Sequence, residues 1–270
     1  MGAGSGSPVL GRPSAAAAAS VPLRETGLAS ESAYRADGGE TGWAGLRAVS
    51  LTGVRHRLAG ETGDDSFAWA RTDERLAMAI ADGLGSLAGS GEAAARAVSA
   101  AVGAATANTG TLLDAAASAI GAANLAAAAG DGATTLVVAV AGRDGAVELA
   151  RVGDSAAFAV RGDGATWSEL FPPPDEDAPA GAATAALPCD LPVAETARIV
   201  LEGEDVLVLA TDGVADPWRD GPSTVAPAVA AAVSARPSPL ELARVADFSR
   251  QGCHDDRTLM VAWMEDGRRR

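Results

Sequence analysis

The chain contains no lysine, so all 21 of its basic residues are arginine, and they are outnumbered by 35 acidic residues. The net charge of −14 argues against non-specific binding to nucleic acid or to an anionic membrane, because both need a basic surface. Cysteine is also scarce: Cys189 and Cys253 cannot build a disulfide framework, so we expect a reducing, cytoplasmic setting. No apolar run is long enough to span a bilayer.

Aromatic residues make up only 4% of the chain, whereas hydrophobic residues make up 48%. The core must therefore be built mainly from Val, Leu, Ile and Ala. A length of 270 residues without heptads or repeats suits one domain with a tail. Residues 1–45 are rich in Gly, Ser, Ala and Pro and predict a disordered tail, either a partner-binding arm or an unselected extension. The domain would then span residues 46–266, followed by a basic end at 267–270.

Short apolar runs that end in Gly or Asp predict strands, and two alanine-rich stretches predict a helical hairpin. The predicted strands span 46–53, 66–73, 76–83, 134–142, 147–155, 156–162, 197–213 and 257–264, and the predicted helices span 89–107, 111–129, 223–235 and 238–251. Because strands and helices come in blocks, we predict an α+β fold: a four-layer αββα sandwich of two mainly antiparallel sheets flanked by helices. Residues 163–196 hold six prolines and are interpreted as a flap beside a functional site or as a surface insertion.

Short aspartate motifs border the predicted strands over nearly the whole domain. They are Asp64-Asp65, Asp82-Gly83, Gly153-Asp154-Ser155, Asp212-Gly213 and Asp255-Asp256. A fold that gathers these strand ends would concentrate carboxylates around hard cations. Oxygen donors without a Cys/His cluster suit Mn²⁺ or Mg²⁺ better than zinc or copper. The pattern therefore predicts a multinuclear metal site.

Six sequence blocks, in order, resemble the signature blocks of the metal-dependent protein phosphatases of the PPM (type 2C) family. They are VRHRLAGETGDDSFAWA, LAMAIADGLGSLAGSGEAAARAV, GDGATTLVVAV, ARVGDSAAFAVRGDG, DVLVLATDGVAD and HDDRTLMVAW, spread over roughly residues 50–264. The order of all six is far more specific than any single Asp-Gly pair, which alone would indicate a turn. The opening block, with His56, Gly60 and Asp65, looks most like the divergent bacterial branch of the family.

The resemblance implies the role of each metal-site residue. Asp82 would bridge two Mn²⁺ or Mg²⁺ ions, and the carbonyl of Gly83 would bind one of them. Asp212 and Asp256 would complete the first metal site. The pair Asp64-Asp65 would supply the second, directly or through water. By the same resemblance, Asp154 would help to hold a possible third ion.

The activity implied by the resemblance is the hydrolysis of phosphoserine and phosphothreonine in proteins, such as the targets of a Ser/Thr kinase. A hydroxide that bridges the two metal ions would attack phosphorus directly, with Asp82 and Asp212 as the central catalytic carboxylates. No covalent nucleophile is needed, in agreement with the lack of a Cys-x5-Arg loop. An alternative is a catalytically impaired scaffold or phosphopeptide-binding module of the same fold. A narrower version of the enzyme hypothesis is a regulatory phosphatase that acts on a small anti-sigma-type or kinase partner.

The sequence departs from the family pattern at the position that holds the substrate phosphate. Gly60 stands where an arginine is usual, four residues before the acidic pair. His56 and Arg57 are the candidate phosphate-binding residues in its place, and Arg55 could also serve. Asp64 replaces the usual glutamate. Leu84 replaces a histidine of eukaryotic members, so a metal-bound water or His56 would protonate the leaving group.

The last block contains two further polar residues whose roles have to be separated. His254 is interpreted as a surface or second-shell histidine rather than a catalytic one. Asp256 is the preferred metal ligand of the pair Asp255-Asp256, because it directly precedes Arg257 and the apolar strand, and Asp255 would face solvent. Cys253 is expected to be a buried or inert thiol.

Overall fold

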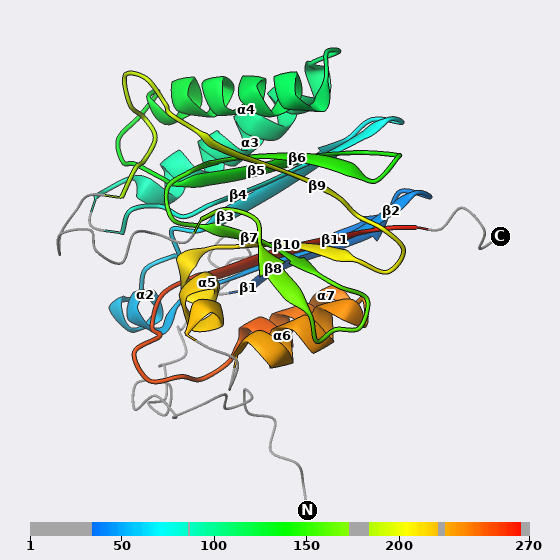
Figure 1. Cartoon of the computed structure of the whole chain (residues 1–270). Coiled ribbons are helices and arrows are strands. Elements are labelled where there is room, and N and C mark those ends of the chain that lie inside the picture. Colours follow the sequence, from blue (N-terminus) through cyan, green and yellow to red (C-terminus); the bar gives the residue numbers. More distant parts are fainter. Residues whose placement is uncertain (1–33, 86, 173–183, 221–224, 266–270) are drawn as a thin grey trace, which may run out of the picture.

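The computed structural model describes residues 34–85, 87–172, 184–220 and 225–265 and contains two antiparallel sheets (Figure 1). The first sheet has, in spatial order, β1 (Tyr34–Glu40), β2 (Ala44–Leu51), β11 (Arg257–Met264), β10 (Val206–Ala210), β7 (Ala156–Val160) and β8 (Trp167–Glu169). The second sheet has, in spatial order, β3 (Ser66–Arg71), β4 (Arg75–Ala81), β5 (Leu136–Gly142), β6 (Ala146–Val152) and β9 (Glu195–Val200). Every paired strand runs antiparallel to its neighbour.

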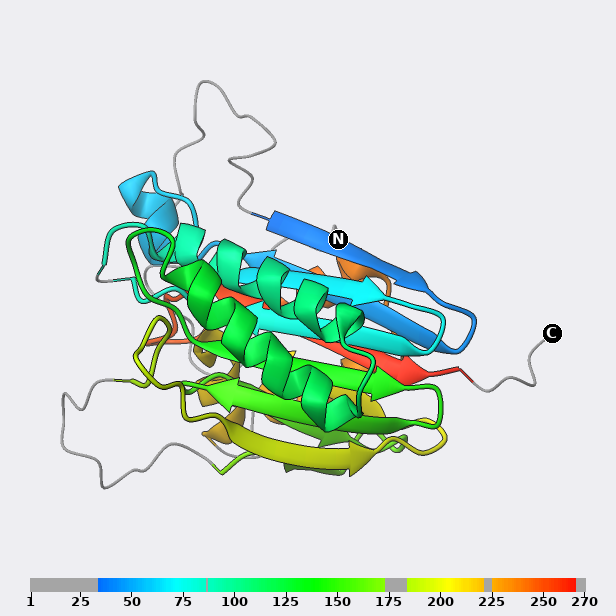
Figure 2. The same cartoon turned by 90° about the horizontal axis from the view of Figure 1, so that it is seen from above.

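Helices cover the outer face of each sheet, so the predicted four-layer αββα sandwich is confirmed (Figures 1 and 2). The second sheet is covered by α3 (Ser90–Ala107) and α4 (Leu112–Ala127). The first sheet is covered by α5 (Asp212–Arg219), α6 (Val225–Ser234) and α7 (Pro239–Ala246). The short helix α2 (Val54–Ala59) lies at one end of the sandwich. A third apolar cluster, which includes Ile80, Leu149, Leu207 and Met260, fills the space between the sheets.

Alanine forms the packing surface of the helical hairpin. Alanines four residues apart are completely buried along α3, at positions 93, 97, 101 and 105, and along α4, at positions 115, 119, 123 and 127. This spacing keeps one helix face turned to the core, and small side chains let the helices pack closely on the sheet. Thr111 begins α4 with a capping box, because its hydroxyl accepts from the Asp114 N–H and the Asp114 carboxylate accepts from the Thr111 N–H.

The tail prediction for residues 1–45 is wrong for residues 34–45, which form β1 and the start of β2. Strand β1 is exposed along nearly its whole length, so it shows no hydrophobic alternation. Its strand conformation comes from backbone pairing with β2 at the edge of the sheet. Residues 1–33, residues 173–183 of the predicted flap, and the basic end 267–270 lie outside the described residues.

The single predicted strand 197–213 is also resolved differently, because its first part is β9 in one sheet and its second part is β10 in the other. Helices α2 and α5 were not predicted. Both are short, and α5 contains Pro217 and begins with the pair Asp212-Gly213, which in the sequence resembles a turn. Helices α6 and α7 lie within the predicted ranges 223–235 and 238–251.

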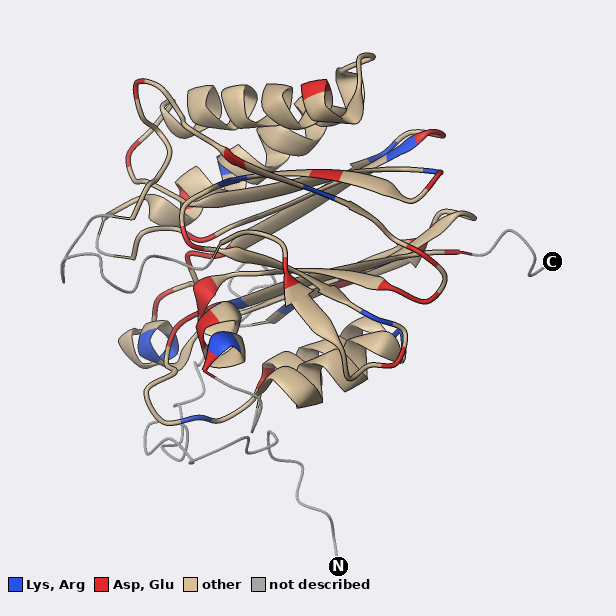
Figure 3. Ribbon diagram, viewed as in Figure 1, with Lys and Arg blue, Asp and Glu red and all other residues tan. Residues whose placement is uncertain are grey.

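The strand register brings the aspartate motifs to one end of the sandwich. Ser66 at the start of β3 pairs with Ala81 at the end of β4, and Ala210 at the end of β10 lies between Ala156 of β7 and Leu259 of β11. The acidic segments that flank these strands therefore meet near α2 and α5, where Figure 3 shows a concentration of acidic residues. In the part of the chain that the structure describes, no helix is long and apolar enough to cross a membrane.

Candidate metal centre

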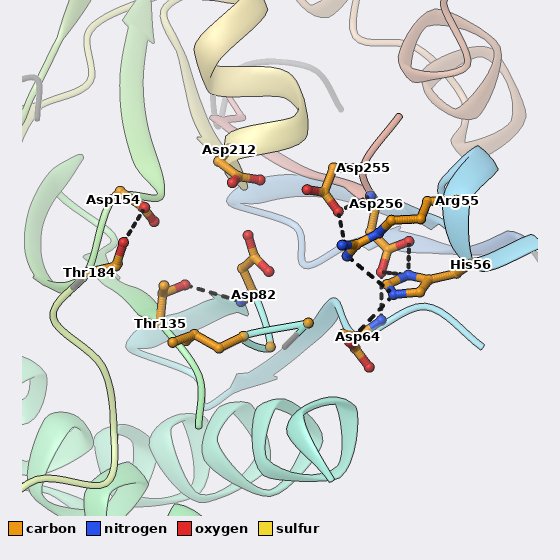
Figure 4. Close-up of a pocket in the computed structure, with 13 residues that line it drawn as sticks. Arg55, His56, Asp64, Asp82, Thr135, Asp154, Thr184, Asp212, Asp255 and Asp256 are labelled. Carbon is orange, nitrogen blue, oxygen red and sulfur yellow. Dashed lines mark hydrogen bonds and ion pairs between the residues drawn. The ribbon is translucent and has the colours of Figure 1, made fainter. Parts of the chain in front are cut away.

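A cavity of about 200 Å³ lies where the aspartate motifs meet, between the ends of the two sheets (Figure 4). The residues that line it are Arg55, His56, Asp64, Asp82, Gly83, Leu84, Gly85, Thr135, Asp154, Thr184, Asp212, Asp255 and Asp256. All but one of the predicted metal-site residues are among them. The exception is Asp65, which is buried and does not line the cavity.

The carboxyl groups of Asp82 and Asp212 point toward each other at the cavity and share a hydrogen bond (Figure 4). Asp82 follows β4, and its backbone is fixed by Thr135: the Asp82 N–H donates to Thr135 Oγ1 over 3.1 Å, and the Asp82 carbonyl accepts from the Thr135 N–H over 2.8 Å. Burial, with repulsion from Asp65 and Asp212, raises the pKa of Asp82 to about 12. Burial raises the pKa of Asp212 to about 6, although a hydrogen bond from Asp82 acts in the opposite direction. Burial and mutual repulsion therefore disfavour full ionisation of these carboxyl groups when no cation is present.

Glycine is required next to each of these two aspartates because the backbone passes too close to other atoms for a side chain. A Cβ at Gly83 would lie 2.7 Å from the Ser90 carbonyl group and 2.9 Å from the carbonyl oxygen of Asp64. A Cβ at Gly213 would lie 1.9 Å from the carbonyl oxygen of Asp256. The two Asp-Gly pairs therefore mark tight contacts between loops, with the Gly83 backbone at the cavity wall.

The acidic pair after α2 splits its two side chains between the cavity and the interior. Asp64 lines the cavity, and burial raises the pKa of its carboxyl group, while the backbone N–H of Gly91 at the start of α3 donates to it. Asp65 is buried and accepts from the Thr211 hydroxyl over 2.8 Å. Burial, followed by repulsion from Asp256, raises the pKa of Asp65 well above its ordinary value. Asp65 thus holds the residue that precedes Asp212.

Asp154 lines the side of the cavity opposite His56 (Figure 4). Its carboxylate accepts from the Thr184 hydroxyl over 3.1 Å, and its carbonyl oxygen accepts from Nη2 of Arg219 over 3.4 Å. Arg219 also forms a short ion pair of 2.6 Å with Glu169 of β8. Glu169 of β8, Arg219 of α5 and Thr184 therefore meet around Asp154. Sequence reasoning missed Thr184, because a lone threonine in a proline-rich segment carries no motif.

Asp255 and Asp256 both line the cavity, but their surroundings differ. Asp256 is buried and its carboxylate accepts from the Gly53 N–H and the Asp64 N–H, each over 2.6 Å. The Asp255 side chain is 51% exposed, and its charge adds to the repulsion felt by Asp82 and Asp212. Sequence reasoning ranked Asp256 first and placed Asp255 towards solvent. In the structure, both oxygens of Asp256 accept a backbone N–H, whereas Asp255 accepts one, from Asp256 over 3.1 Å.

The two arginines of α2 point in different directions because residues two apart lie roughly 200° apart around a helix. The guanidinium of Arg55 lines the cavity and lies 3.7 Å from Asp255. Arg57 does not line it; its guanidinium lies over the Tyr34 ring, at 6.0 Å from the ring centre. Buried His56 does reach the cavity and contacts Asp256. Of the two predicted phosphate-binding residues, the structure therefore brings His56 to the site and leaves Arg57 outside, with Arg55 in the corresponding place.

His254 lies beside the cavity rather than in it. It lines an adjoining hollow of about 210 Å³ together with Cys253, and this hollow shares Arg55, Asp212 and Asp255 with the first. The carbonyl oxygen of His254 accepts from the Arg55 N–H over 3.3 Å, which fixes the turn against α2. Burial raises the pKa of the Cys253 thiol. A raised pKa keeps the thiol protonated, as expected for an unreactive cysteine.

The donor set of the cavity fits Mn²⁺ or Mg²⁺. Its lining combines several carboxylates with the close-packed Gly83 backbone, and the mutual repulsion of those carboxylates is the kind that divalent cations relieve. Among the described residues, no three His, Cys, Asp or Glu side chains stand close enough together to enclose an ion as they are.

A sequence model of the family described as protein phosphatase 2C matches residues 52–243, which is most of the chain. The chain therefore belongs to the protein phosphatase 2C family, the PPM phosphatases. No sequence among curated proteins matches it.

Several solved structures share the fold, and those of MsPP and PstP are structures of serine/threonine phosphatases. RsbX, crystallised with magnesium, is 16% identical with a TM-score of 0.61, over 86% of this chain and 100% of RsbX. The PPM Ser-Thr phosphatase MsPP from Mycobacterium smegmatis, in complex with cacodylate, is 18% identical with a TM-score of 0.62, over 82% and 98% of the two chains. The catalytic domain of the phosphatase PstP, in complex with two manganese ions, is 22% identical with a TM-score of 0.56, over 83% and 99%. At these identities the likeness shows the fold.

Proposed function

We propose that this protein is a Mn²⁺- or Mg²⁺-dependent phosphoprotein phosphatase that acts on phosphoserine and phosphothreonine. The observation that carries the proposal is the meeting of Asp82, Asp212, Asp255, Asp64 and Asp154 around one cavity from five separate loops. The fold likeness to PstP, crystallised with two manganese ions, and to RsbX, crystallised with magnesium, supports the choice of metal. The substrate class follows from the family, and we propose a cytoplasmic setting for it.

The chain's own residues would hold two ions and a possible third. Asp82 would bridge the first two, and the Gly83 carbonyl would bind one of them. Asp212 and one of the pair Asp255-Asp256 would complete the first site. The pair Asp64-Asp65 would supply the second site, directly or through water. Asp154 would hold the third. When bound, the ions would supply an activated water and neutralise charge on the phosphate.

Arg55 would bind the phosphate group of the substrate. It is the cationic side chain that lines the cavity from α2, and it also borders the adjoining hollow. A guanidinium can donate two parallel hydrogen bonds to a phosphate, which fixes the direction of the P–O bond to be cleaved. The family pattern has its phosphate-binding arginine at position 60, but here that position is Gly60. It ends α2 with a φ of 76°, a conformation that disfavours residues other than glycine.

The proposal is tested by hydrolysis of an aryl phosphate and a phosphothreonine peptide with and without Mn²⁺. Hydrolysis should depend on Mn²⁺ and fall by about a hundredfold or more in Asp82→Asn and in Asp212→Asn, as expected when a central catalytic interaction is lost. Asp73→Asn, in the exposed turn between β3 and β4, is the matched control and should keep the wild-type rate. Metal-independent hydrolysis, or unchanged rates in both variants, would exclude the proposal.

The alternative is a catalytically impaired PPM fold that binds phosphopeptides as a scaffold or reader. It is favoured by the glycine at position 60, where the family pattern has the arginine that anchors the substrate phosphate. Tight binding of the phosphothreonine peptide without turnover at saturating Mn²⁺ would support this alternative. Multiple turnovers per protein molecule would rule it out.

A further inference from the structure

We propose that Asp256 and His56 are positioning residues: they form a chain with Arg55 that aims its guanidinium at the substrate phosphate, and the Asp256 side chain does not bind metal. The inference rests on the proposed function for the identity of the anion. Figure 4 shows these side-chain contacts, which run from Asp256 through His56 to Arg55.

Asp256 already has the hydrogen bonds of a structural carboxylate. Oδ1 accepts from the Gly53 N–H and Oδ2 from the Asp64 N–H, each over 2.6 Å, and Nδ1 of His56 lies 3.0 Å and 3.1 Å from the two oxygens. The carboxylate therefore ties the residue before α2, the acidic pair after α2 and the imidazole to one point. A metal ion could use these oxygens only by displacing such donors, which would release the loops that form the cavity wall.

His56 lies between Asp256 and Arg55 and contacts both, so it can orient the Arg55 side chain. The imidazole is buried, and because Nδ1 faces a carboxylate, its proton belongs on Nδ1. Nε2 then carries a lone pair and can accept from Nη2 of Arg55, which lies 3.4 Å away. Asp64 lies near the same nitrogen, with Oδ2 at 3.6 Å. The Arg55 contact, and not the more distant Asp64 oxygen, is therefore the one through which the imidazole can hold the guanidinium at the cavity.

Two further contacts show that the place of the guanidinium is built by the fold. A Cβ at Gly85 would lie 2.6 Å from Nη2 of Arg55, so a side chain at position 85 would push the guanidinium out of its present place. The Asp255 carboxylate forms an ion pair with the guanidinium, with Oδ1 3.7 Å from Nη2 of Arg55. The arginine is thus held between three loops, although its side chain is 56% exposed and open to an incoming anion.

A double-mutant cycle on the full chain tests the coupling, with inorganic phosphate as the ligand in the presence of Mn²⁺ and KM for an aryl phosphate as a second readout. Arg55→Ala should weaken phosphate binding and raise KM by about tenfold to a hundredfold, the range for a lost charge-assisted hydrogen bond. His56→Ala should change both in the same direction. The double variant should be no worse than Arg55→Ala within about twofold, since His56 acts through Arg55. Additive effects would overturn the proposal.

Conservative variants guard against misfolding. His56→Gln keeps one donor for Asp256 and one acceptor for Arg55, so it should restore most of the affinity lost in His56→Ala. If His56→Gln is as weak as His56→Ala in a folded protein, the chain of contacts does not position the arginine. Arg143→Ala, in the exposed turn between β5 and β6, controls for the loss of one positive charge and should leave phosphate binding unchanged.

Mn²⁺ binding, followed by electron paramagnetic resonance without substrate, tests the second half of the proposal. Asp256→Asn should keep the number of bound ions and their affinity within about threefold, whereas Asp255→Asn should weaken binding by about tenfold or more. Loss of an ion in Asp256→Asn would show that Asp256 is a ligand. Because phosphate and Mn²⁺ binding need no turnover, a wild-type protein without hydrolysis would refute the proposed function while leaving both measurements decisive here.

Discussion

At the scale of single residues, the glycine after Asp212 is the most demanding position of the site. In Gly213→Ala, the new Cβ would lie 1.9 Å from the Asp256 carbonyl oxygen, so one of the two loops must move. We expect the free energy of unfolding in urea to fall by about 2 kcal/mol or more, as for other overpacked sites. Gly121→Ala in α4 is the matched control: nothing lies within 4 Å, so the same exchange should stabilise by up to about 1 kcal/mol. Equal stability of both variants would contradict this contact.

The arginines of α2 show what residue patterns can and cannot predict. The aspartate motifs are read directly, since each one stands at a strand end and the fold gathers those ends. The choice between Arg55 and Arg57 depends on the phase of a six-residue helix that has no hydrophobic periodicity long enough to detect. The same holds for Asp255 and Asp256, because the backbone donors that saturate Asp256 come from residues about two hundred positions earlier in the chain.

Helix α5 carries Asp212 at its first turn, and at the scale of elements its position depends on an aromatic stack. Trp218 lies parallel to Phe158 of β7, with ring centres 4.4 Å apart, and meets the edge of Trp167 at 6.4 Å. We expect Trp218→Ala to lower the free energy of unfolding by about 3–5 kcal/mol and to weaken Mn²⁺ binding, because α5 loses its anchor on the sheet. Leu240→Ala is the control: its side chain is 78% exposed, so stability should change by less than about 0.5 kcal/mol. An unchanged urea midpoint in Trp218→Ala would show that α5 is held elsewhere.

Element boundaries were predictable where a segment buries one face and unpredictable where it does not. The hairpin of α3 and α4 is written in the sequence as alanine repeats with a Thr-x-x-Asp cap. Strand β1 is exposed and contains two adjacent glycines, so nothing in its composition favours a strand; it exists because β2 offers unpaired backbone groups at the sheet edge. The exposed face of β1 explains why composition assigned it to a tail.

At the scale of the whole molecule, burial of the apolar core stabilises the fold, whereas burial of the site's carboxyl groups destabilises it. The two sheets and their helices bury an apolar core, yet the same architecture forces Asp65, Asp82 and Asp212 together at one end. This convergence was predicted from the aspartate motifs at strand ends and from the resemblance of six ordered sequence blocks to a family in which such carboxylates share one metal site. The pKa values of these three carboxyl groups depend on their burial and on the distances between them, which only the folded structure provides.

The resulting charge conflict predicts how stability depends on pH and metal. Without divalent ions, the folded pKa values of Asp82 and Asp212 are about 12 and about 6, both above the ordinary 3.8, so the folded state binds more protons than the unfolded state. Their contribution to stability is complete below about pH 4 and declines as pH rises, through the pKa of Asp212 and on towards that of Asp82. In a chelator, the melting temperature should therefore fall between about pH 5 and pH 8.

Saturating Mn²⁺ should reverse this trend, because a cation replaces the protons on the carboxylates and binds more tightly when they are ionised. The rise in melting temperature on adding Mn²⁺ should thus be larger at pH 8 than at pH 5. Calorimetry of the wild type and of Asp82→Asn, at both pH values and with either chelator or Mn²⁺, measures the effect. Asp82→Asn removes the buried acid, so its melting temperature in chelator should fall less with pH. Equal Mn²⁺ increments at the two pH values would mean that these carboxylates do not bind the ion, whereas a difference that disappears in Asp82→Asn would assign the linkage to Asp82.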